Sequence, residues 1–248
     1  MIKQGAEIML DNVRIVLVST SDQRNVGSAA RAMKTMGISD LVLVNPLEIP
    51  EGKAAALAAG ATDILAQART VSSLTEAIAD CQLTFAASAR SRTLDWPMTT
   101  PREVAQKVIT EGQTAKVAIV FGREATGLTN EELQLCHFHT HIPANPEYSS
   151  LNLAMAVQTL CYEVRVAYLA AEEAEYPDAE GDYPTAGEME GFYQHLQRAI
   201  TQSGFIVRNH PGKVMNKLRR LYTRTRPDKN ELNILRGILT SFERHDKK

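Results

Sequence analysis

Five short aliphatic and β-branched runs alternate with helical patterns along the first 170 residues of the chain. Continuous apolar runs of about five residues are typical of strands buried on both faces of a parallel sheet. The predicted strands are Val13–Ser19, Leu41–Asn45, Leu83–Ala87, Val117–Phe121 and, with a weaker pattern, His139–Ile142. The predicted helices are Val26–Met36, Ala54–Ala59, Ser73–Ala79, Arg102–Thr110, Asn130–Leu135 and Ser150–Ala171. This alternation predicts an α/β domain with helices on both faces of the sheet.

A ligand site is expected at the carboxyl ends of these strands, because ligands of open α/β sheets bind there. The loops concerned follow Ser19, Ala87, Phe121 and Ile142. The loop after Ser19 lacks the G-x-G-x-x-G of a dinucleotide site, and Leu128 stands where a P-loop would place its lysine. Ser88, Ser149 and Ser150 lie outside any G-x-S-x-G nucleophile elbow. These loops therefore exclude three common chemistries.

One cluster has the residue types of a metal site: Cys136, His137, His139 and His141. Alternate histidines on a strand share one face, which is a possible zinc arrangement. No carboxylate or second cysteine stands at ligand spacing, however. An edge strand with exposed imidazoles is the favoured interpretation, and no metal is expected.

Composition places the chain among ordinary globular proteins, with 44% hydrophobic and 23% charged residues. No apolar run approaches the roughly 20 residues that a membrane-spanning helix needs. The first residues, MIKQGAEIML, lack a long apolar stretch, so a secretory signal is not expected. Cys81, Cys136 and Cys161 form no close-spaced pair, which favours reduced thiols and a cytoplasmic protein without membrane partners.

Charge is distributed unevenly along the chain. Residues 1–197 carry 14 Lys and Arg against 25 Asp and Glu, a net charge of −11, and residues 198–248 carry 13 against 4, a net charge of +9. Such a basic segment is a credible footprint for a polyanion, although charge runs are more often solvated helical surface. The residues from 170 to 190 contain no Lys or Arg and no apolar periodicity, which is typical of a linker.

The predicted organisation is therefore a domain over residues 1–170, an acidic linker over 171–188 and a basic helical domain over 189–248. The last domain is expected to hold three helices, Met189–Ser203, Gly212–Thr225 and Asp228–Glu243, with little core of its own. Along the second of them, basic residues recur at spacings of three and four between Lys213 and Arg220, so they share neighbouring rows of one face.

Three further clusters stand at the predicted strand ends. The first, Asn25–Arg31, opens a helix and places Arg31 near the helix N-terminus, where a cation opposes the helix dipole. It is either a surface arginine or one that faces an anion. The second, Phe121–Leu128, contains two glycines that permit close approach of a ligand or simply a tight turn. The third, Asn145–Leu153, leads into the longest helix with serines at a capping position and Asn152 just inside.

In this order, the clusters resemble the TrmH-like branch of the SPOUT methyltransferase superfamily, whose patterns are N-x-G-x-x-x-R, F-G-x-E-x-x-G-L and a Ser-Leu-Asn segment. Further segments, among them SARSRTLDWPM and NHPGKVMNKLRRLYTRTRP, extend the resemblance to the bacterial tRNA (cytidine/uridine-2'-O-)-methyltransferases of this branch. The resemblance implies a parallel sheet with a C-terminal trefoil knot, a homodimer whose knots face each other, and methylation of a tRNA ribose at position 32 of the anticodon loop. S-adenosylmethionine is the implied methyl donor.

The resemblance also implies the roles of particular residues. The cofactor pocket is carried over to Ala87, Ser88, Ala89, Gly122, Ile142, Ser149, Ser150 and Leu151. Arg31 matches the catalytic arginine. Because a guanidinium has a pKa above about 12, clamping phosphate and stabilising charge suit it better than acting as a base. Asn25 and Asn152 are expected to orient loops or the ribose. Arg24, Arg90 and Arg92 are expected to contact RNA.

Two alternatives remain open at this point. One is a methyltransferase that acts on ribosomal RNA, since a fold does not separate RNA substrates. The other is an RNA-binding protein that keeps the fold without catalysis, against which the intact Arg31 and Ser-Leu-Asn segment argue.

Overall fold

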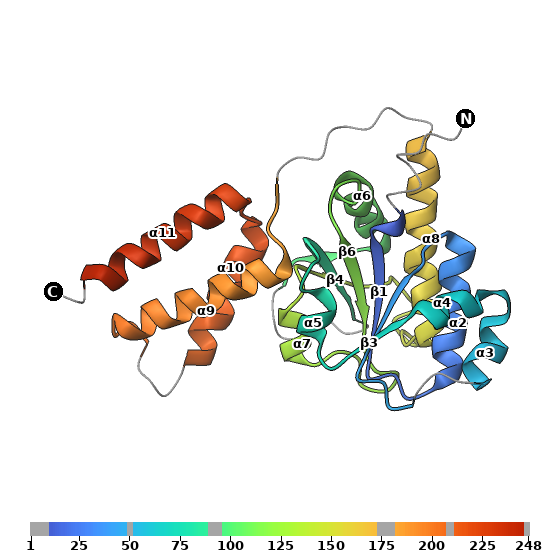
Figure 1. The fold of residues 1–248 in the computed structure, drawn as a ribbon. Coiled ribbons are helices and arrows are strands. Elements are labelled where there is room, and N and C mark those ends of the chain that lie inside the picture. Colours follow the sequence, from blue (N-terminus) through green and yellow to red (C-terminus); the bar gives the residue numbers. More distant parts are fainter. Residues whose placement is uncertain (1–9, 49–51, 89–95, 173–181, 207–210, 246–248) are drawn as a thin grey trace.

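The computed structural model describes residues 10–48, 52–88, 96–172, 182–206 and 211–245 (Figure 1). Within these residues, the centre is a parallel sheet in the strand order β3-β2-β1-β6-β4-β7-β5. The strands are β1 (Val13–Val18), β2 (Asp40–Val44), β3 (Arg69–Val71), β4 (Leu83–Ala87), β5 (Met98–Thr99), β6 (Val117–Phe121) and β7 (Phe138–Thr140). Ile15 at the centre of β1 pairs with Leu41 on one side and Ile119 on the other.

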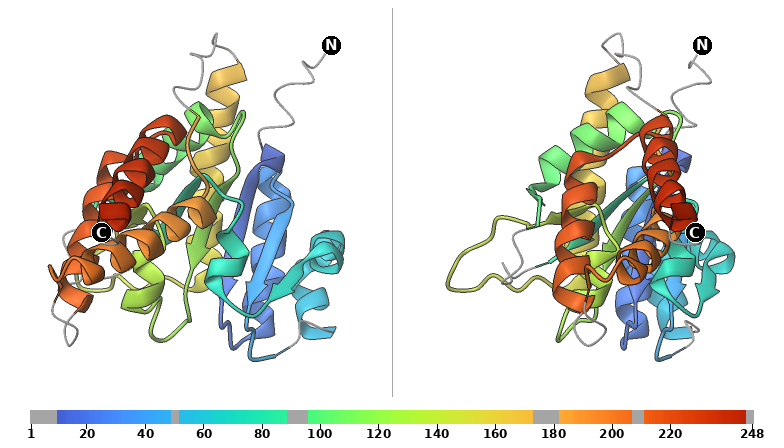
Figure 2. Two further views of the ribbon diagram at one scale, coloured as in Figure 1. Left: turned by 60° about the vertical axis from the view of Figure 1, so that its left-hand side comes forward. Right: turned by 90° about the vertical axis from the view of Figure 1, so that its left-hand side faces the viewer.

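Helices cover both faces of the sheet, as the sequence predicts (Figure 2). One face packs against α2 (Gln23–Met36), α3 (Gly52–Ala58), α4 (Thr62–Gln67), α6 (Pro101–Glu111) and α8 (Leu153–Glu172). The other packs against α5 (Leu74–Ile78) and α7 (Asn130–Gln134). A short 3-10 turn, Ala59–Ala61, joins α3 to α4. In the described part of the chain, no helix is long and apolar enough to cross a membrane.

The predicted elements are confirmed with ends that move by up to three residues, whereas β3, β5 and α4 were missed. β3 and β5 are three and two residues long, too short to show a hydrophobic period. The missing β5 explains a second error. β7 is not an edge strand, because it lies between β4 and β5.

Two of the three histidines near β7 are therefore buried, and the third, His141, is partly exposed. His137 and His139 are 8% and 5% exposed. Burial and the charge of Arg226 lower the pKa of His137 to about 3, and His139 stacks on Trp96 with ring centroids 5.3 Å apart. Among the described residues, no group of three or more His, Cys, Asp or Glu is arranged to hold a metal ion.

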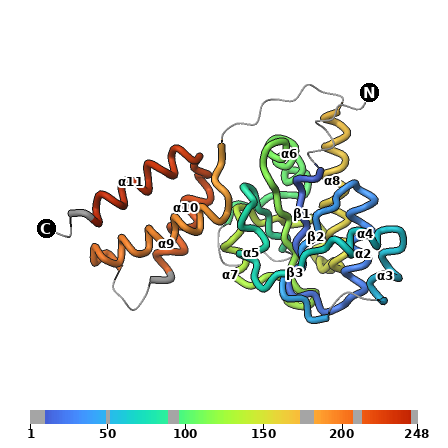
Figure 3. The backbone as a smooth tube through the Cα atoms, in the orientation of Figure 1, coloured from blue at the N-terminus to red at the C-terminus, as the bar shows by residue number. Residues whose placement is uncertain are grey.

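The C-terminal part consists of α9 (Ala186–Gln202), α10 (Pro211–Thr225) and α11 (Lys229–His245), drawn in orange to red beside the sheet in Figure 3. α9 begins three residues earlier than predicted, behind a capping box of Thr185 and Glu188. The expectation of little core was wrong. A separate cluster of buried side chains joins the three helices: Met189, Phe192, Tyr193, Leu196, Ala199, Ile206, Met215, Leu232 and Leu239. Aromatic residues supply the volume that short helices lack.

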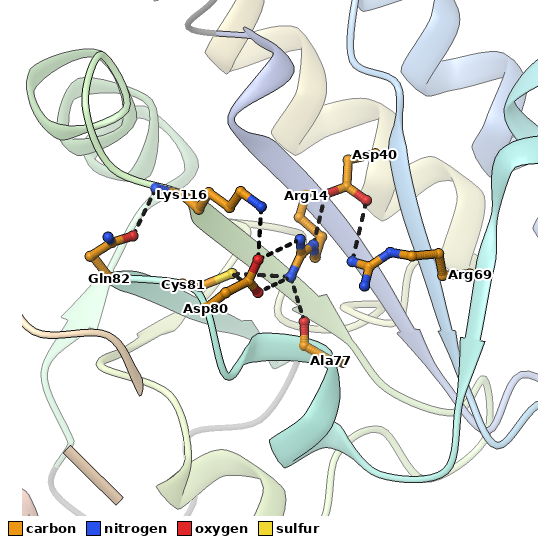
Figure 4. Close-up of polar contacts among 8 residues, drawn as sticks. All are labelled: Arg14, Asp40, Arg69, Ala77, Asp80, Cys81, Gln82 and Lys116. Carbon is orange, nitrogen blue, oxygen red and sulfur yellow. Dashed lines mark hydrogen bonds and ion pairs between the residues drawn. The ribbon is translucent and has the colours of Figure 1, made fainter. Parts of the chain in front are cut away.

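A buried arginine connects several elements near the amino ends of the strands (Figure 4). Arg14 on β1 is 2% exposed and donates to Asp40 at 2.7 Å, to the Ala77 carbonyl at 2.7 Å and to both oxygens of Asp80. Burial raises the pKa of Asp80, but hydrogen bonds from Arg14 and Lys116 outweigh it and hold that pKa well below its ordinary value. This network lies near the amino ends of the strands, so it stabilises the sheet and takes no part in the site below.

Candidate active site at the carboxyl ends of the strands

A cavity of about 250 Å³ lies where β4, β6 and β7 end. Its wall contains seven of the eight residues predicted for the cofactor pocket: Ala87, Ser88, Gly122, Ile142, Ser149, Ser150 and Leu151. The eighth, Ala89, lies outside the described residues, as do Arg90 and Arg92. These positions come from three segments of the chain that together extend over more than 60 residues. They meet because the carboxyl ends of parallel strands share one edge of the sheet.

Small residues shape this cavity, and Gly122 is the most constrained of them. A Cβ atom added there would lie 2.2 Å from the Gly127 carbonyl carbon and 2.3 Å from the Leu128 nitrogen. Arg123 and Gly127 close the turn by exchanging two backbone hydrogen bonds of 3.2 and 2.9 Å, and Gly127 adopts a positive φ of 69°. Gly122 is thus required by the turn itself, so a substitution of Gly122 tests the turn before it tests a ligand contact.

A chain of hydrogen bonds joins the three sequence clusters. The Asn152 amide donates to Asn25 Oδ1 at 2.9 Å, and the Asn25 amide donates to Glu124 Oε1 at 3.0 Å. Glu124 also accepts from the backbone and hydroxyl of Ser21. Burial raises the pKa of Glu124, but the hydrogen bonds from Asn25 and Ser21 outweigh it and keep the pKa below its ordinary value. The carboxylate therefore stays ionised and holds the loop ends in register.

Asn152 stands before α8 and not inside it, contrary to the sequence interpretation. α8 begins at Leu153, and Asn152 Oδ1 accepts from the backbone of Ala154 at 2.9 Å. Asn152 thus caps α8 with one side-chain atom and fixes Asn25 with the other. Ser149 and Ser150, which were expected at the capping position, lie in the cavity wall instead. In the sequence, Glu124 is part of the second cluster but has no assigned role. Its role as the acceptor that joins Asn25 and Ser21 is visible only in the fold.

Arg31 faces a second, open groove of about 710 Å³ on the other side of this hydrogen-bonded chain. Asn25 and Asn152 line the groove, whereas Glu124 lines the cavity. The hydrogen bonds among these three residues therefore lie between the two spaces. α2 begins at Gln23, which places Arg31 two turns into the helix and not near its N-terminus. Helix-dipole opposition, expected from the sequence, is therefore weak at this position.

The Arg31 side chain is exposed and makes no hydrogen bond or ion pair with the residues that the structure describes. Arg24 lines the same groove, but it is already paired with Asp22 through contacts of 2.7 to 3.0 Å. Gly27 serves packing, because a Cβ there would lie 2.1 Å from the Ala54 carbonyl of α3. Of the arginines lining the groove, Arg31 is the one left available for an anionic ligand.

Both parts of the chain match models of known protein families. The model of the SpoU rRNA Methylase family matches residues 12–162, which include the cavity and the groove. The model of the tRNA methyltransferase TrmJ C-terminal domain matches residues 187–248, which correspond to the helical part.

Individual relatives agree with these matches. The chain is 59% identical over 242 residues to the tRNA (cytidine/uridine-2'-O-)-methyltransferase TrmJ of Klebsiella pneumoniae subsp. pneumoniae, covering 96% of this chain and 99% of that protein. The crystal structure of TrmJ from Z. mobilis ZM4 matches with a TM-score of 0.79 at 33% identity, covering 93% of this chain and 98% of that chain. The SpoU methyltransferase AviRb from Streptomyces viridochromogenes, in complex with AdoMet, has a TM-score of 0.51 at 18% identity, covering 64% of this chain and 59% of that chain. This last likeness shows a shared fold alone.

Proposed function

The chain belongs to the SpoU methylase family, and from this premise we propose that it methylates the ribose 2'-hydroxyl of cytidine or uridine in tRNA. The observation that carries the proposal is the 59% identity to an enzyme named for this reaction, which extends over nearly the whole of both chains. The match of residues 187–248 to a tRNA methyltransferase domain favours tRNA over ribosomal RNA. Position 32 of the anticodon loop is the proposed target nucleotide.

The cavity at the strand ends is the proposed site of S-adenosylmethionine. Its wall combines small residues, such as Ala87, Ser88 and Gly122, with apolar side chains, such as Ile142 and Leu153, which suits an adenine held by backbone groups. When bound, the cofactor supplies an electrophilic methyl group on a sulfonium. The protein's task is to hold the ribose oxygen in line with that methyl group, a task of positioning.

Arg31 is the proposed catalytic residue, acting from the groove beside the cavity. Its guanidinium is a planar cation with paired donors, which suits it to hold the RNA phosphate and to stabilise the negative charge that develops on the 2'-oxygen. The chain of Asn152, Asn25 and Glu124 keeps the two spaces adjacent. We propose that it orients the loops around the ribose.

Narrowing the cavity without disturbing its turn is expected to remove cofactor binding. Ala156 lies on α8 in the cavity wall, so Ala156→Leu should place a larger side chain where the ligand binds. The dissociation constant for S-adenosylhomocysteine, measured by calorimetry, should rise at least about tenfold, or about 1.4 kcal/mol. The control is Ala170→Leu, an exposed position on the same helix. Unchanged affinity in a normally folded Ala156→Leu protein would move the cofactor elsewhere.

A homodimer is also proposed, and the observation behind it is an apolar stripe on α8. Met155, Tyr162, Val166 and Leu169 are 40 to 65% exposed, and their spacings of seven, four and three place them on one face of the helix. Met155 also lines the Arg31 groove, so a second copy on this stripe would adjoin the catalytic residue.

Two charges on the stripe are expected to separate the subunits. The variant Tyr162→Glu/Val166→Glu should have the mass of one chain, 27.3 kDa, by light scattering, whereas the unmodified protein should have twice that mass. It should also lose methylation activity. Ile238→Glu, at a similarly exposed position on α11, is the control and should remain dimeric. A fully active monomer would rule out a site shared between subunits.

The remaining parts of the proposal follow from the fold. The position of β7 supports a trefoil knot. Residues 88–97 connect β4 to β5 in the chain, yet β7, which comes later in the chain, lies between these two strands in the sheet. The three-part organisation is supported by the end of α8 at Glu172 and the start of α9 at Ala186. A cytoplasmic location fits three buried free cysteines, whose burial raises each thiol pKa to about 12.

Mapping ribose methylation in tRNA and ribosomal RNA incubated with the protein and S-adenosylmethionine tests the proposed function. We expect 2'-O-methylation of the pyrimidine at position 32 of tRNA, and none in ribosomal RNA. Methylation confined to ribosomal RNA would support the alternative substrate. Binding of tRNA without methylation of either RNA would support a non-catalytic binding protein.

A further inference from the structure

The helical domain, of which the structure describes residues 182–206 and 211–245, packs with α9 and α10 against α5 and α7 of the methyltransferase domain. Two attachments between these described parts also contain hydrogen bonds. At the first, the N-terminus of α9 meets the C-terminal end of α5. The Ala186 and Gly187 amides donate to the Cys81 and Ala79 carbonyls at 2.6 and 3.1 Å. Two unsatisfied helix ends thereby satisfy each other. A Cβ at Gly187 would lie 2.8 Å from the Ala79 oxygen, so the contact is close.

Arg226 makes the second attachment from the turn between α10 and α11. It forms an ion pair with Glu111 at the end of α6, donates to the Gln82 carbonyl at 3.4 Å, and stacks over the Tyr183 ring at 4.4 Å. The Arg226 and Glu111 side chains are only 12% and 11% exposed. Among the described residues, the second carboxylate oxygen of Glu111 has no hydrogen-bond partner, so this ion pair is its main compensation for burial.

The backbone of Arg226 is held in an unusual conformation. Its φ is 46°, in the left-handed region that a side chain disfavours, and Pro227 restricts it further. Such strain persists only where surrounding contacts fix it. Here the backbone amide of Arg226 donates to the Tyr222 carbonyl within the helical domain at 3.1 Å, and its side chain pairs with Glu111 of the other domain. The turn that sets the direction in which α11 leaves α10 is therefore tied to the interface.

The attachment point lies at the C-terminal end of α10, and two exposed lysines, Lys213 and Lys217, lie toward its N-terminal end. Glu111 and Gln82 precede β6 and β4, so Arg226 is anchored near the amino ends of the strands. α10 has 15 residues, a length of about 22 Å at 1.5 Å per residue. Its start lies at the same end of the molecule as the loops that follow the strands (Figures 1 and 2). Lys213 and Lys217 are exposed near that start.

We propose that Arg226 is a positioning residue for tRNA: it holds the helical domain in one orientation, so that the basic face of α10 and the Arg31 groove engage one tRNA together. This inference rests on the proposed tRNA methylation. When two sites are held at a fixed span, binding at the second becomes intramolecular. A helical domain that rotates about its linker loses that advantage while keeping every cation on its surface.

Arg219 provides a matched control within the helical domain. Its side chain is 18% exposed, forms an ion pair with Glu190 at 2.7 Å, and stacks over Tyr193 at 4.4 Å. It therefore has the same residue type, partner type and ring contact as Arg226. The ion pair of Arg219 joins α10 to α9 inside one domain, and its side chain lines a small crevice facing α5 and α7, with no ion pair across it among the described residues. The ion pair of Arg226 joins the two domains.

The experiment compares Arg226→Ala, Arg219→Ala and the charge swap Arg226→Glu/Glu111→Arg in the full chain. For Arg226→Ala, we expect KM for tRNA to rise about tenfold, because the two RNA-binding surfaces no longer act together. The kcat should stay within about twofold of the unmodified protein, and the affinity for S-adenosylhomocysteine should not change. The slope of log affinity against log salt should stay the same, because no phosphate-contacting cation is removed. Hydrogen exchange at Ala186 and Gly187 should accelerate. The swap should restore most of the KM, and Arg219→Ala should leave the KM and this exchange unchanged.

Three outcomes would overturn the proposal: an unchanged KM in Arg226→Ala, an equal rise in Arg219→Ala, or a flattened salt slope, which would make Arg226 a direct RNA contact. Where Arg226→Ala fails to fold, the swap and Arg226→Lys carry the test, since lysine keeps the charge but loses the planar guanidinium geometry. Absence of tRNA methylation by the unmodified protein would refute the proposed function itself, while the exchange measurement would still report the docking.

Discussion

Replacing Arg31 with alanine is expected to reduce methyl transfer by about a hundredfold to a thousandfold, the loss seen when one electrostatic stabiliser of a transition state is removed. The effect should fall on kcat, because charge develops on the ribose oxygen only during the reaction. Stability should not change, since the Arg31 side chain is exposed and has no partner among the described residues. Affinity for S-adenosylhomocysteine should also be preserved, because Arg31 lines the groove and not the cavity.

Two further variants separate this role from general attraction of RNA. Arg31→Lys keeps the charge but not the planar pair of donors, so activity should recover only in part. Arg24→Ala removes a second arginine from the same groove, but that arginine is already neutralised by Asp22, and the loss should stay within a few-fold. Activity of Arg31→Ala within a few-fold of the unmodified protein, measured as methyl incorporation into tRNA, would remove Arg31 from the catalytic assignment.

The cavity was predictable from sequence because parallel strands bring their carboxyl ends to one edge. Ala87 and Ile142 end predicted strands and Gly122 directly follows one, so their meeting needs only the strand order. The roles of particular atoms were not predictable. Gly122 is equally consistent with a ligand contact and a tight turn until a Cβ is placed against the Gly127 backbone. The hydrogen bond from Asn152 to Asn25 spans 127 positions, and no local pattern encodes it.

Charge patterns were the least reliable guide, because a sequence does not show which charges pair internally. Along α10, the basic residues between Lys213 and Arg220 were predicted to share one face, within a segment, residues 198–248, that was interpreted as a basic surface. The structure divides them. Arg219 and Arg226 form partly buried ion pairs with Glu190 and Glu111, whereas Lys213, Lys217 and Arg224 stay exposed. Acidic residues near the linker also form such internal ion pairs: Glu190, the partner of Arg219, lies in the first turns of α9.

Neutralising this exposed set is expected to weaken tRNA binding severely and to change its salt dependence. Lys213, Lys217 and Arg224 follow at spacings of four and seven, so they share one face of α10. Each phosphate that a cation neutralises releases counterions, so removing one such cation lowers the slope of log affinity against log salt by roughly 0.9. The triple variant Lys213→Ala/Lys217→Ala/Arg224→Ala should therefore have a visibly flatter slope, with unchanged affinity for S-adenosylhomocysteine.

These substitutions test the helical domain better than its deletion does. Removing residues 189–248 would cut α9 after its third residue and strip Met189, Phe192 and the rest of the shared core. It would also leave Glu111 buried without Arg226, at a cost of about 3 kcal/mol or more to the methyltransferase domain. A loss of RNA binding after deletion could then reflect that damage. The exposed cations carry no such structural role, so titrating tRNA at several salt concentrations isolates their charge. If the slope of the triple variant equals that of the unmodified protein, the +9 segment is a solvated surface and tRNA is held by the groove alone.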